Sequence, residues 1–357
     1  MSARLPAARA CARTLRTLLL GPLYALQLLS SAKSFRDNPL IGSRRLNERG
    51  LHRARLRLAH RLAQRRRARL AERIAPEDRR AFDRDGFLVK RSFLAPAHFD
   101  ELLREIRAYR GPAREEYQGN ALTRRMACDA RLLGAVPALG RLLAEPDWRA
   151  LTRYVGSFDA EPMVYVQSIF SHARPGAPDP QETLHSDTFH ATLKCWLFLC
   201  DVAPGCLCFR YVPGSHRLTP ARLAWEHERS LELCREGEFR SRRGSLRVTE
   251  QDLERLGLPP AVEIAVPANT LLLADTHGFH ARGASAGPAL RVEIWAYDRR
   301  NPFRPWVGLD PWQWHALRDR RIGAFWRLGD ALERLQLKPQ LWRPRERVGA
   351  FERAGEG

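Results

Sequence analysis

The sequence predicts a mainly β fold with flanking helices, of the jelly-roll or sandwich type. Short apolar segments rich in β-branched and aromatic residues, separated by Gly/Pro turns, are typical of these folds. In the last segment, Val292, Ile294 and Ala296 alternate with charged or bulky residues, as expected for a strand with one face in a core. The five segments span residues 165–170, 193–202, 206–212, 269–275 and 291–297.

Candidate metal ligands lie at the ends of these segments. The triplet His185-Ser186-Asp187 is followed 95 residues later by His280 and 11 residues after that by Arg291. Residues two apart on an extended chain point to the same side. Two histidines and one carboxylate can hold a metal on one face and leave three positions open, as in non-haem iron oxygenases. An arginine fork suits a carboxylate such as that of 2-oxoglutarate.

Residues 164–291 resemble the phytanoyl-CoA dioxygenase family of iron(II)- and 2-oxoglutarate-dependent oxygenases. The resemblance rests on the HSD triplet, on GCLCFRYVPGSH at 205–216 and on VPANTLLLADTHGFHARGAS at 266–285. It implies a cupin-like double-stranded β-helix in which His185, Asp187 and His280 hold Fe(II) and carry the catalysis. The intact Asp187 argues against a halogenase, in which the carboxylate is replaced.

The resemblance also implies the co-substrates and their pocket. Arg291 is expected to bind the distal carboxylate of 2-oxoglutarate, with Gln167 and Trp196 lining that pocket. With dioxygen, the enzyme would hydroxylate a C–H bond and release succinate and carbon dioxide. Two places after His280 the family often has a small polar residue, whereas this chain has Arg282, so the role of Arg282 stays open.

The remaining histidines near the site have competing interpretations. His277 is an alternative to His280 as third ligand, but the spacing to Arg291 favours His280. His277 would then support the ligands or hydrogen-bond its own loop. His190 and His172 flank the triplet and either reach the substrate or have a structural role, which is the simpler expectation. His216 closes a PGSH turn and is expected to be structural.

Two other function classes remain open. One is a non-oxygenase metal-binding cupin, such as a hydrolase or isomerase, and the other is a catalytically silent scaffold on a membrane or a partner. Arg291 at its spacing favours the oxygenase over the first, and the intact ligand set disfavours the second. The sequence holds no serine or cysteine nucleophile motif, no phosphate-cradling glycine loop and no internal repeat.

Charge and composition divide the chain into three parts. There are 60 Lys and Arg residues against 40 Asp and Glu, and residues 1–80 alone hold 20 against 5. We expect a basic N-terminal extension (1–80), a jelly-roll dioxygenase domain (81–300) and a Trp/Arg-rich helical tail (301–357). An insertion at 220–260, expected as two helices with a cap at Thr249 and Asp252, would form a lid. Trp225 and Arg222 of this insertion either line the mouth or pack.

The N-terminal extension contains two features. Residues 18–32 are apolar, follow four arginines (Arg4, Arg9, Arg13 and Arg16), and are short for a membrane span. A secretory signal or an organelle transit peptide are alternatives, but we expect a peripheral anchor or a segment packed on the core. The spacing of leucines and arginines in residues 51–74 predicts a basic amphipathic helix, which either contacts anionic lipid or clamps the barrel.

These features set the expected partners and location. The expected partners are a small-molecule or lipid-linked substrate and an anionic membrane surface contacted by the extension. Nucleic acid is not expected, because no recognised binding motif accompanies the basic charge. Iron(II), 2-oxoglutarate and seven cysteines without obvious pairing favour a reducing cytoplasm, with the protein peripheral to the membrane. The sequence does not indicate an oligomeric state.

Overall fold

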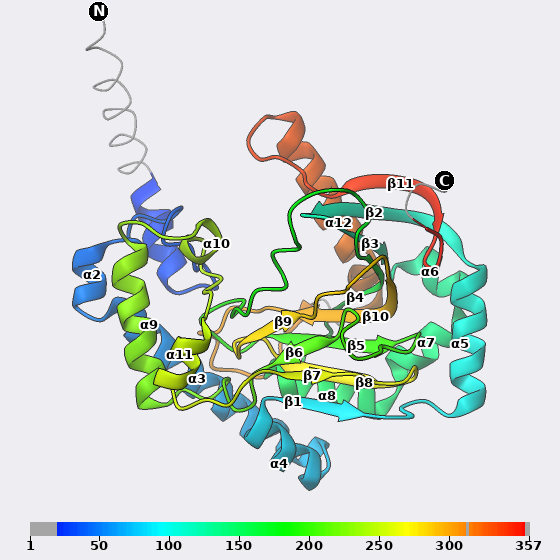
Figure 1. Ribbon diagram of the computed structural model, residues 1–357, viewed down its shortest axis with the longest axis horizontal. Coiled ribbons are helices and arrows are strands. Elements are labelled where there is room, and N and C mark those ends of the chain that lie inside the picture. The colour runs from blue at the N-terminus through cyan, green and yellow to red at the C-terminus, as the bar shows by residue number, and fades with distance from the viewer. Residues whose placement is uncertain (1–19, 312–313, 354–357) are drawn as a thin grey trace, which may run out of the picture.

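Two antiparallel sheets face each other in the computed structural model, which describes residues 20–311 and 314–353 (Figure 1). The four leading arginines and Trp312 therefore lie outside the described residues. The small sheet has the order β7 (Val262–Ile264), β6 (Phe209–Tyr211) and β9 (His280–Arg282). The large sheet has the order β1 (Phe87–Lys90), β8 (Leu271–Asp275), β5 (Leu193–Phe198), β10 (Leu290–Asp298), β4 (Met163–Phe170), β3 (Ala121–Ala127), β2 (Arg110–Gln118) and β11 (Arg343–Gly349).

The two sheets confirm the predicted jelly-roll fold. The alternation of residues along each strand gives the large sheet one face in the apolar core and one face on the space between the sheets. On β10, Val292, Ile294 and Ala296 pack into the core behind the large sheet. The intervening Trp295 and Tyr297 point into the space between the sheets, where they meet other aromatic side chains. Because successive strand residues point to opposite faces, the predicted pattern places charged and aromatic residues around a central cavity.

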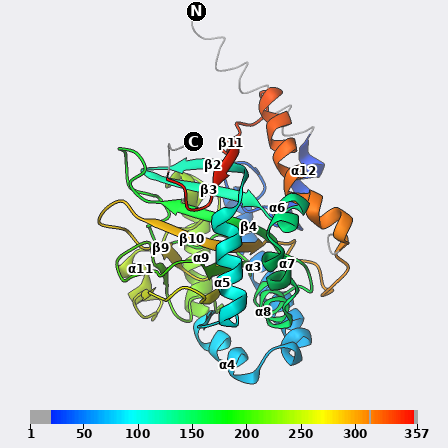
Figure 2. The same cartoon turned by 90° about the vertical axis from the view of Figure 1, so that its right-hand side faces the viewer.

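Four helices cover the outer face of the large sheet (Figure 2). They are α5 (Pro96–Ala108), α6 (Ala130–Ala135), α7 (Pro137–Ala144) and α8 (Pro146–Gly156). Their apolar faces and the strands form the main core, in which Leu102, Leu139 and Trp148 are fully buried. Burying this apolar area is the main favourable contribution to folding, and it fixes the register of the strands that carry the site.

A second group of helices lies beside the sheets (left in Figure 1). It contains α2 (Arg44–Glu48), α3 (Leu51–Leu70), α9 (Pro220–Leu233), α10 (Phe239–Arg242) and α11 (Glu250–Arg255); α3 continues into η1 (Ala71–Arg73) and α4 (Pro76–Asp85). The predicted helix at 51–74 is thus confirmed up to Leu70. Two of its arginines are buried: Arg66 donates to main-chain carbonyls and Arg67 pairs with Asp275 at 2.8 Å. This part of the basic helix clamps the barrel.

The insertion at 220–260 forms three helices rather than two, because a short turn, α10, precedes α11. The predicted cap at Thr249 and Asp252 is confirmed as a reciprocal capping box. Trp225 and Arg222 are both buried in packing contacts and do not line the cavity. No helix among the described residues is long and apolar enough to cross a membrane.

The C-terminal tail holds a helix, as expected, and also a strand that the sequence did not reveal. The helix is α12 (His315–Arg334), and β11 then pairs with β2 at the edge of the large sheet. β11 reads RPRERVG, which lacks the apolar alternation of a half-buried strand, and its first five residues are exposed. Strands β2 and β3 were also missed, because β2 is rich in Arg and Glu and β3 contains two adjacent arginines.

Candidate metal centre and active-site cavity

Backbone pairing brings the two candidate ligand histidines together. The main-chain N–H of His185 donates to the carbonyl of His280 at 2.9 Å, and the N–H of His280 donates back at the same distance. Their imidazole centroids lie 4.5 Å apart. Asp187 follows on the same extended segment, held by its N–H to the carbonyl of Thr276 at 2.9 Å. The 95-residue separation in sequence is thus closed by one bridge between two strand ends.

His185, Asp187 and His280 converge as the sequence predicts. One ligand atom from each lies within 4.8 Å of the others. His185 Nε2 is 3.7 Å from Asp187 Oδ1, and His280 Nε2 is 3.7 Å from Asp187 Oδ2. Among the described residues this is the only group of three or more His, Cys, Asp or Glu side chains with such spacing. Two imidazole nitrogens and one carboxylate are a donor set that suits divalent transition metals.

Hydrogen bonds fix which imidazole nitrogen faces the cluster. His185 Nδ1 lies 2.7 Å from the carbonyl of Thr183, and His280 Nδ1 lies 3.0 Å from the carbonyl of Gly278. A carbonyl only accepts, so each Nδ1 carries the proton and each Nε2 presents a lone pair. Carbonyl partners of this kind hold the ring orientation of metal-binding histidines.

Burial and nearby charges set the protonation of the three side chains. Burial, reinforced by the neighbouring His280, lowers the pKa of His185 well below its usual value. Burial also lowers the pKa of His280 to about 4. For Asp187, burial raises the pKa, but Lys194 and the two histidines outweigh it and hold the pKa well below its usual value. At neutral pH the cluster is therefore two neutral imidazoles and one carboxylate.

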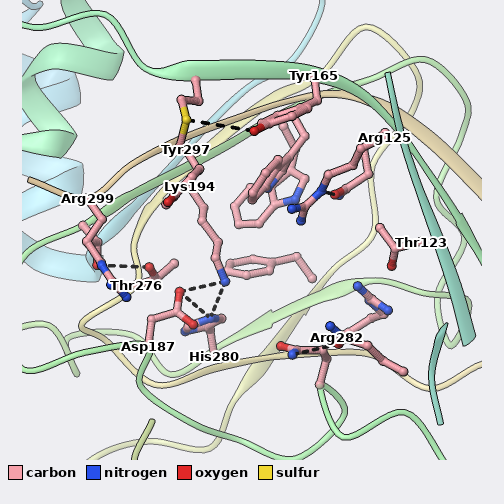
Figure 3. Close-up of a pocket in the computed structure, with 18 of the residues that line it drawn as sticks. Thr123, Arg125, Tyr165, Asp187, Lys194, Thr276, His280, Arg282, Tyr297 and Arg299 are labelled. Carbon is pink, nitrogen blue, oxygen red and sulfur yellow. Dashed lines mark hydrogen bonds and ion pairs between the residues drawn. The ribbon is translucent and has the colours of Figure 1, made fainter. Parts of the chain in front are cut away.

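A lysine already neutralises this carboxylate. Lys194 Nζ lies 2.7 Å from Asp187 Oδ2 and 3.4 Å from His280 Nε2 (Figure 3). The cluster thus attracts a cation by its own geometry, which fits a metal site. A metal ion that binds Asp187 requires the ammonium of Lys194 to move away, because two cations would repel each other at this distance.

The cluster opens into a cavity of about 390 Å³ between the two sheets. Figure 3 shows Arg125 and Arg282 well separated from Asp187 and His280 across this space. Its walls include side chains from seven strands, β2 to β6, β9 and β10, and most of these are alternate residues, as the strand pattern requires. The side chains that line it include the predicted Gln167, Trp196, Arg282 and Arg291, together with Tyr165, Phe209, Trp295 and Tyr297.

Arg291 lies at the cavity as predicted, but it is already partnered. Its guanidinium donates to the carbonyl of Leu207 and pairs with Glu293, with Nε 2.7 Å from Oε2. Gln167 links this pair to the next cation: its Nε2 donates to Glu293 at 2.6 Å, and its Oε1 accepts from Arg125 at 2.7 Å. Burying a charged pair costs desolvation unless further hydrogen bonds satisfy it, and Gln167 supplies one of them.

The structure gives Arg282, whose role the sequence left open, a place in the cavity wall and an acidic partner. Arg282 lines the cavity and pairs with the buried Asp179.

Trp196 packs on Phe209, with ring centroids 4.5 Å apart, and closes the wall beside the cluster.

Four charged residues of the cavity were missed in the sequence: Arg125, Lys194, Lys33 and Arg299. Arg125 stacks on Trp295, 3.9 Å from the ring centroid, and it lies on a strand whose composition hid it. Lys194 stands two residues before Trp196 on β5, so strand alternation alone could have placed both on one face. Lys33 comes from the N-terminal extension, and no local pattern marks it.

None of the other four histidines considered in the sequence joins the cluster. His277 Nδ1 hydrogen-bonds the carbonyl of Thr188 at 3.0 Å, so His280, not His277, joins the cluster. His190 is buried, bonds the carbonyl of Ala191 and does not line the cavity. His172 bonds the carbonyl of Ser285 at 2.9 Å. His216 is buried with its ring 5.4 Å from that of Phe82.

The family model for phytanoyl-CoA dioxygenase (PhyH) matches residues 82–284, which include all three residues of the cluster. The chain belongs to the phytanoyl-CoA dioxygenase family. The match covers more than half of the chain and leaves out the first 81 residues and the tail, including α3, α12 and β11. None of the curated protein sequences compared with this family member gives a match.

Several solved structures are similar to this family member at low sequence identity. One is the non-heme alpha ketoglutarate dependent epimerase SnoN from nogalamycin biosynthesis, with 20% identity and a TM-score of 0.42 over 64% of this chain and 82% of that one. Another is HygX from Streptomyces hygroscopicus with nickel and 2-oxoglutarate bound, with 18% identity and a TM-score of 0.38 over 63% and 87%. A third is EctD from S. alaskensis with bound Fe, with 18% identity and a TM-score of 0.39 over 67% and 83%.

Proposed function

We propose that the protein is an iron(II)- and 2-oxoglutarate-dependent dioxygenase that hydroxylates a C–H bond of a small-molecule or lipid-linked substrate. The observation that carries this proposal is the convergence of His185, Asp187 and His280 beside an arginine-lined cavity. Membership of the phytanoyl-CoA dioxygenase family supports it. A bound iron supplies the redox chemistry with dioxygen and 2-oxoglutarate that side chains cannot perform.

In this proposal the three side chains hold the metal without any proton loss at neutral pH. His185 and His280 already present the Nε2 lone pair, and Asp187 is already ionised. Their arrangement on one side leaves the cavity side of the metal free for co-substrate and dioxygen. Lys194 leaves Asp187 on metal binding and remains a cation at the cavity wall.

We assign the far end of the cavity to the distal carboxylate of 2-oxoglutarate. Arg291 is the main partner in this assignment, with Gln167 and Trp196 lining the pocket. Glu293 offsets the charge of Arg291 and Asp179 offsets that of Arg282, so Arg125 is needed to keep this end attractive to an anion. The aromatic walls exclude water, which strengthens these electrostatic contacts.

We also propose how the parts of the chain serve this function. Residues 81–300 form the catalytic unit, with 220–260 as its lid, and the flanking parts complete the cavity. Contact with an anionic membrane is proposed for the N-terminal extension, because Leu23, Leu26 and Leu29 are exposed and four arginines precede them in the sequence. Co-sedimentation of the full chain with anionic vesicles, and not with neutral ones, would support this contact.

The proposed cofactor pair is tested by anaerobic addition of iron(II) and then 2-oxoglutarate while the visible spectrum is recorded. We expect a metal-to-ligand charge-transfer band in the wild type. The band should be lost in His280→Ala, and Asp187→Ala should abolish succinate formation. His277→Gln, which changes a neighbouring histidine outside the cluster, is the matched control and should keep the band.

The outcomes separate the alternatives. A folded wild type without the band would favour a non-oxygenase metal-binding cupin or a silent scaffold. Loss of the band in His277→Gln but not in His280→Ala would reverse the ligand assignment. A band with succinate formation but no hydroxylated product would keep the cofactors and direct the search to other oxidative reactions on the same metal.

A further inference from the structure

A segment outside the family match completes the active-site cavity. The described chain begins with helical residues 20–28, and residues 29–38 then run to the cavity before α2 begins. The main-chain N–H of Arg36 donates to the carbonyl of Arg242 at 3.1 Å, which ties this segment to α10 of the insertion. The segment therefore touches the proposed lid and the metal cluster at once.

Two buried side chains fix this segment in place. Arg55 of α3 is buried and donates three hydrogen bonds, at 2.7 to 3.1 Å, to the carbonyls of Leu28, Ser30 and Ala32. Phe35 is buried in an apolar cluster with residues of the insertion and with Val212 and Phe279, which border β6 and β9. Lys33 lies between these two anchors, so the position of its side chain is set by the fold and not by a free loop.

Lys33 reaches the candidate metal centre. Its ammonium donates to the main-chain carbonyl of Asp187, which is its only hydrogen bond within residues 20–311 and 314–353. A lysine from a segment 154 residues away in sequence thus lies against the backbone of a proposed metal ligand. An ammonium has three donors, so two donors of Lys33 are left for another acceptor.

Lys33 also stands where two cavities meet. The inner cavity of about 390 Å³ and an outer cavity of about 680 Å³ share a small set of lining residues. These shared residues are Lys33, Arg299, Gln118, Gln181, His185 and Asp187. A molecule that enters from the outer cavity therefore passes two cations and two amides before it meets the metal cluster.

The two cations at this junction lack an acidic partner, whereas three of the other four cavity cations have one; the fourth, Arg125, hydrogen-bonds Gln167 instead. Arg282 pairs with Asp179, Arg291 pairs with Glu293, and Lys194 pairs with Asp187. In the part of the chain that the structure describes, no carboxylate lies within ion-pair distance of Lys33 or Arg299. Two neighbouring cations without a direct ion-pair partner at a cavity mouth are suited to an anion.

We propose that Lys33 and Arg299 bind an anionic group of the primary substrate, a phosphate, sulfate or carboxylate, at the junction of the two cavities. This inference rests on the proposed oxygenase function and names the substrate class of the same site. The N-terminal extension thereby acts as a specificity element, because it supplies a substrate-binding lysine that the family-matched region lacks. The co-substrate is bound separately, at the Arg291 end.

The test is a ligand-detected NMR titration of the full chain with phenyl phosphate, in the presence of zinc and saturating 2-oxoglutarate. Phenol is the neutral probe. We expect phenyl phosphate to bind more tightly than phenol, and Lys33→Gln and Arg299→Gln each to weaken it by at least about tenfold, as for the loss of a charged hydrogen bond. Lys33→Arg keeps the cation and should retain most of the affinity.

Two further variants control for unspecific effects of removing a positive charge. Lys338→Gln removes one of the chain's four lysines at an exposed position and should leave the titration unchanged. Arg299 is exposed, so Arg299→Gln carries the test if Lys33→Gln does not fold. Unchanged phenyl phosphate binding in folded Lys33→Gln and Arg299→Gln would overturn the proposal. Equal losses of 2-oxoglutarate affinity in these variants would assign the pair to the co-substrate and also overturn it.

Succinate release in the presence of different anionic compounds shows whether the anionic group belongs to a free metabolite or to a lipid headgroup. Soluble phosphate monoesters are compared with their parent alcohols, and vesicles of phosphatidylglycerol with vesicles of phosphatidylcholine. Stimulation by the anionic member of either pair supports the proposal and identifies a free metabolite or a lipid headgroup as source. Stimulation by neutral members only would contradict it, and if neither class stimulates, the titration alone decides.

This inference and the proposed function fail in different ways. If the charge-transfer band is absent but phenyl phosphate binding depends on Lys33, the oxygenase proposal fails and the anion site stands. If the band is present and the probe binds independently of Lys33 and Arg299, only the substrate class is wrong.

Discussion

Single residues at the cluster are prepared for a metal by burial and by hydrogen bonds to the backbone. His185 and His280 each place Nδ1 on a carbonyl two residues earlier in the chain. That local contact depends on the loop conformation and leaves Nε2 free to bind a metal. The carboxylate of Asp187 is balanced by the ammonium of Lys194, so the cluster carries little net charge before metal binding.

The depressed pKa of His280, about 4, predicts an unusual pH dependence of metal binding. A histidine with an ordinary pKa near 6.5 would lose metal affinity about tenfold per pH unit below that value, because the proton competes for Nε2. Here we expect less than about a threefold change between pH 8 and 5.5, and a steep loss only below about pH 4. Equilibrium dialysis with cobalt(II) measures this directly.

Folding must be followed in the same samples, because the same shift affects stability. In the unfolded chain His280 binds a proton near pH 6.5, but in the folded chain it does so only near pH 4. Protonation therefore favours unfolding, and stability is lost as the pH falls between these values, by up to about 1.4 kcal/mol per pH unit. A tenfold affinity loss between pH 6.5 and 5.5 in folded protein would contradict the prediction.

Hydrogen bonds from a few buried polar side chains, as well as packing of apolar faces, hold the helices and strands in place. Helix α3 carries the basic residues that suggested a lipid-facing surface. Its Arg66 is instead buried and donates to the carbonyls of Ser157, Pro302 and Arg304 at 2.6 to 3.1 Å. It therefore joins the N-terminal extension to the end of α8 and to the segment after β10.

This geometry predicts that Arg66→Met strongly destabilises the fold. The substitution removes the donors for three buried carbonyls, each of which costs about 1–3 kcal/mol when unsatisfied. We expect a loss of about 3–5 kcal/mol in the free energy of unfolding. Urea denaturation followed by tryptophan fluorescence measures it. Arg65→Met changes an exposed neighbour on the same helix and should cost less than about 0.5 kcal/mol.

The whole molecule depends on β11 to close one edge of the large sheet. β11 pairs with β2. The last residue of β11 and the residue after it accept hydrogen bonds from the interior: Arg124 donates to the carbonyl of Gly349 at 2.7 Å, and Ser168 Oγ donates to the carbonyl of Ala350. A strand edge without its partner presents unpaired N–H and carbonyl groups to other chains.

We therefore expect a chain that ends at residue 341 to self-associate through β2 and to lose thermal stability. Size-exclusion chromatography with light scattering and a thermal melt would show both effects. A chain that ends at residue 353, which keeps β11, is the control and should behave like the full chain. A monomeric, fully stable chain ending at 341 would show that β11 does not protect this edge.

The sequence by itself predicted the β fold and five of its strands and, through the family resemblance, the three residues of the cluster. Local properties account for part of this: alternation selects the two faces of β10, and extended geometry places His185 and Asp187 on one side. The choice of His280 over His277 depended on the spacing to Arg291 that the resemblance implies. The helix at 51–70 and the cap of α11 were readable for the same reason.

Only the tertiary structure decided which distant side chains share the cavity. Lys33 meets Asp187 across 154 residues, and Glu293 meets Arg291 with Gln167 and Arg125 across three paired strands. The spacing of residues along a short stretch of sequence cannot predict such contacts. They depend on the register between paired strands and on the closure of long loops, which involve distant parts of the chain. The polar strands β2, β3 and β11 are formed by pairing with neighbours and not by their own apolar pattern.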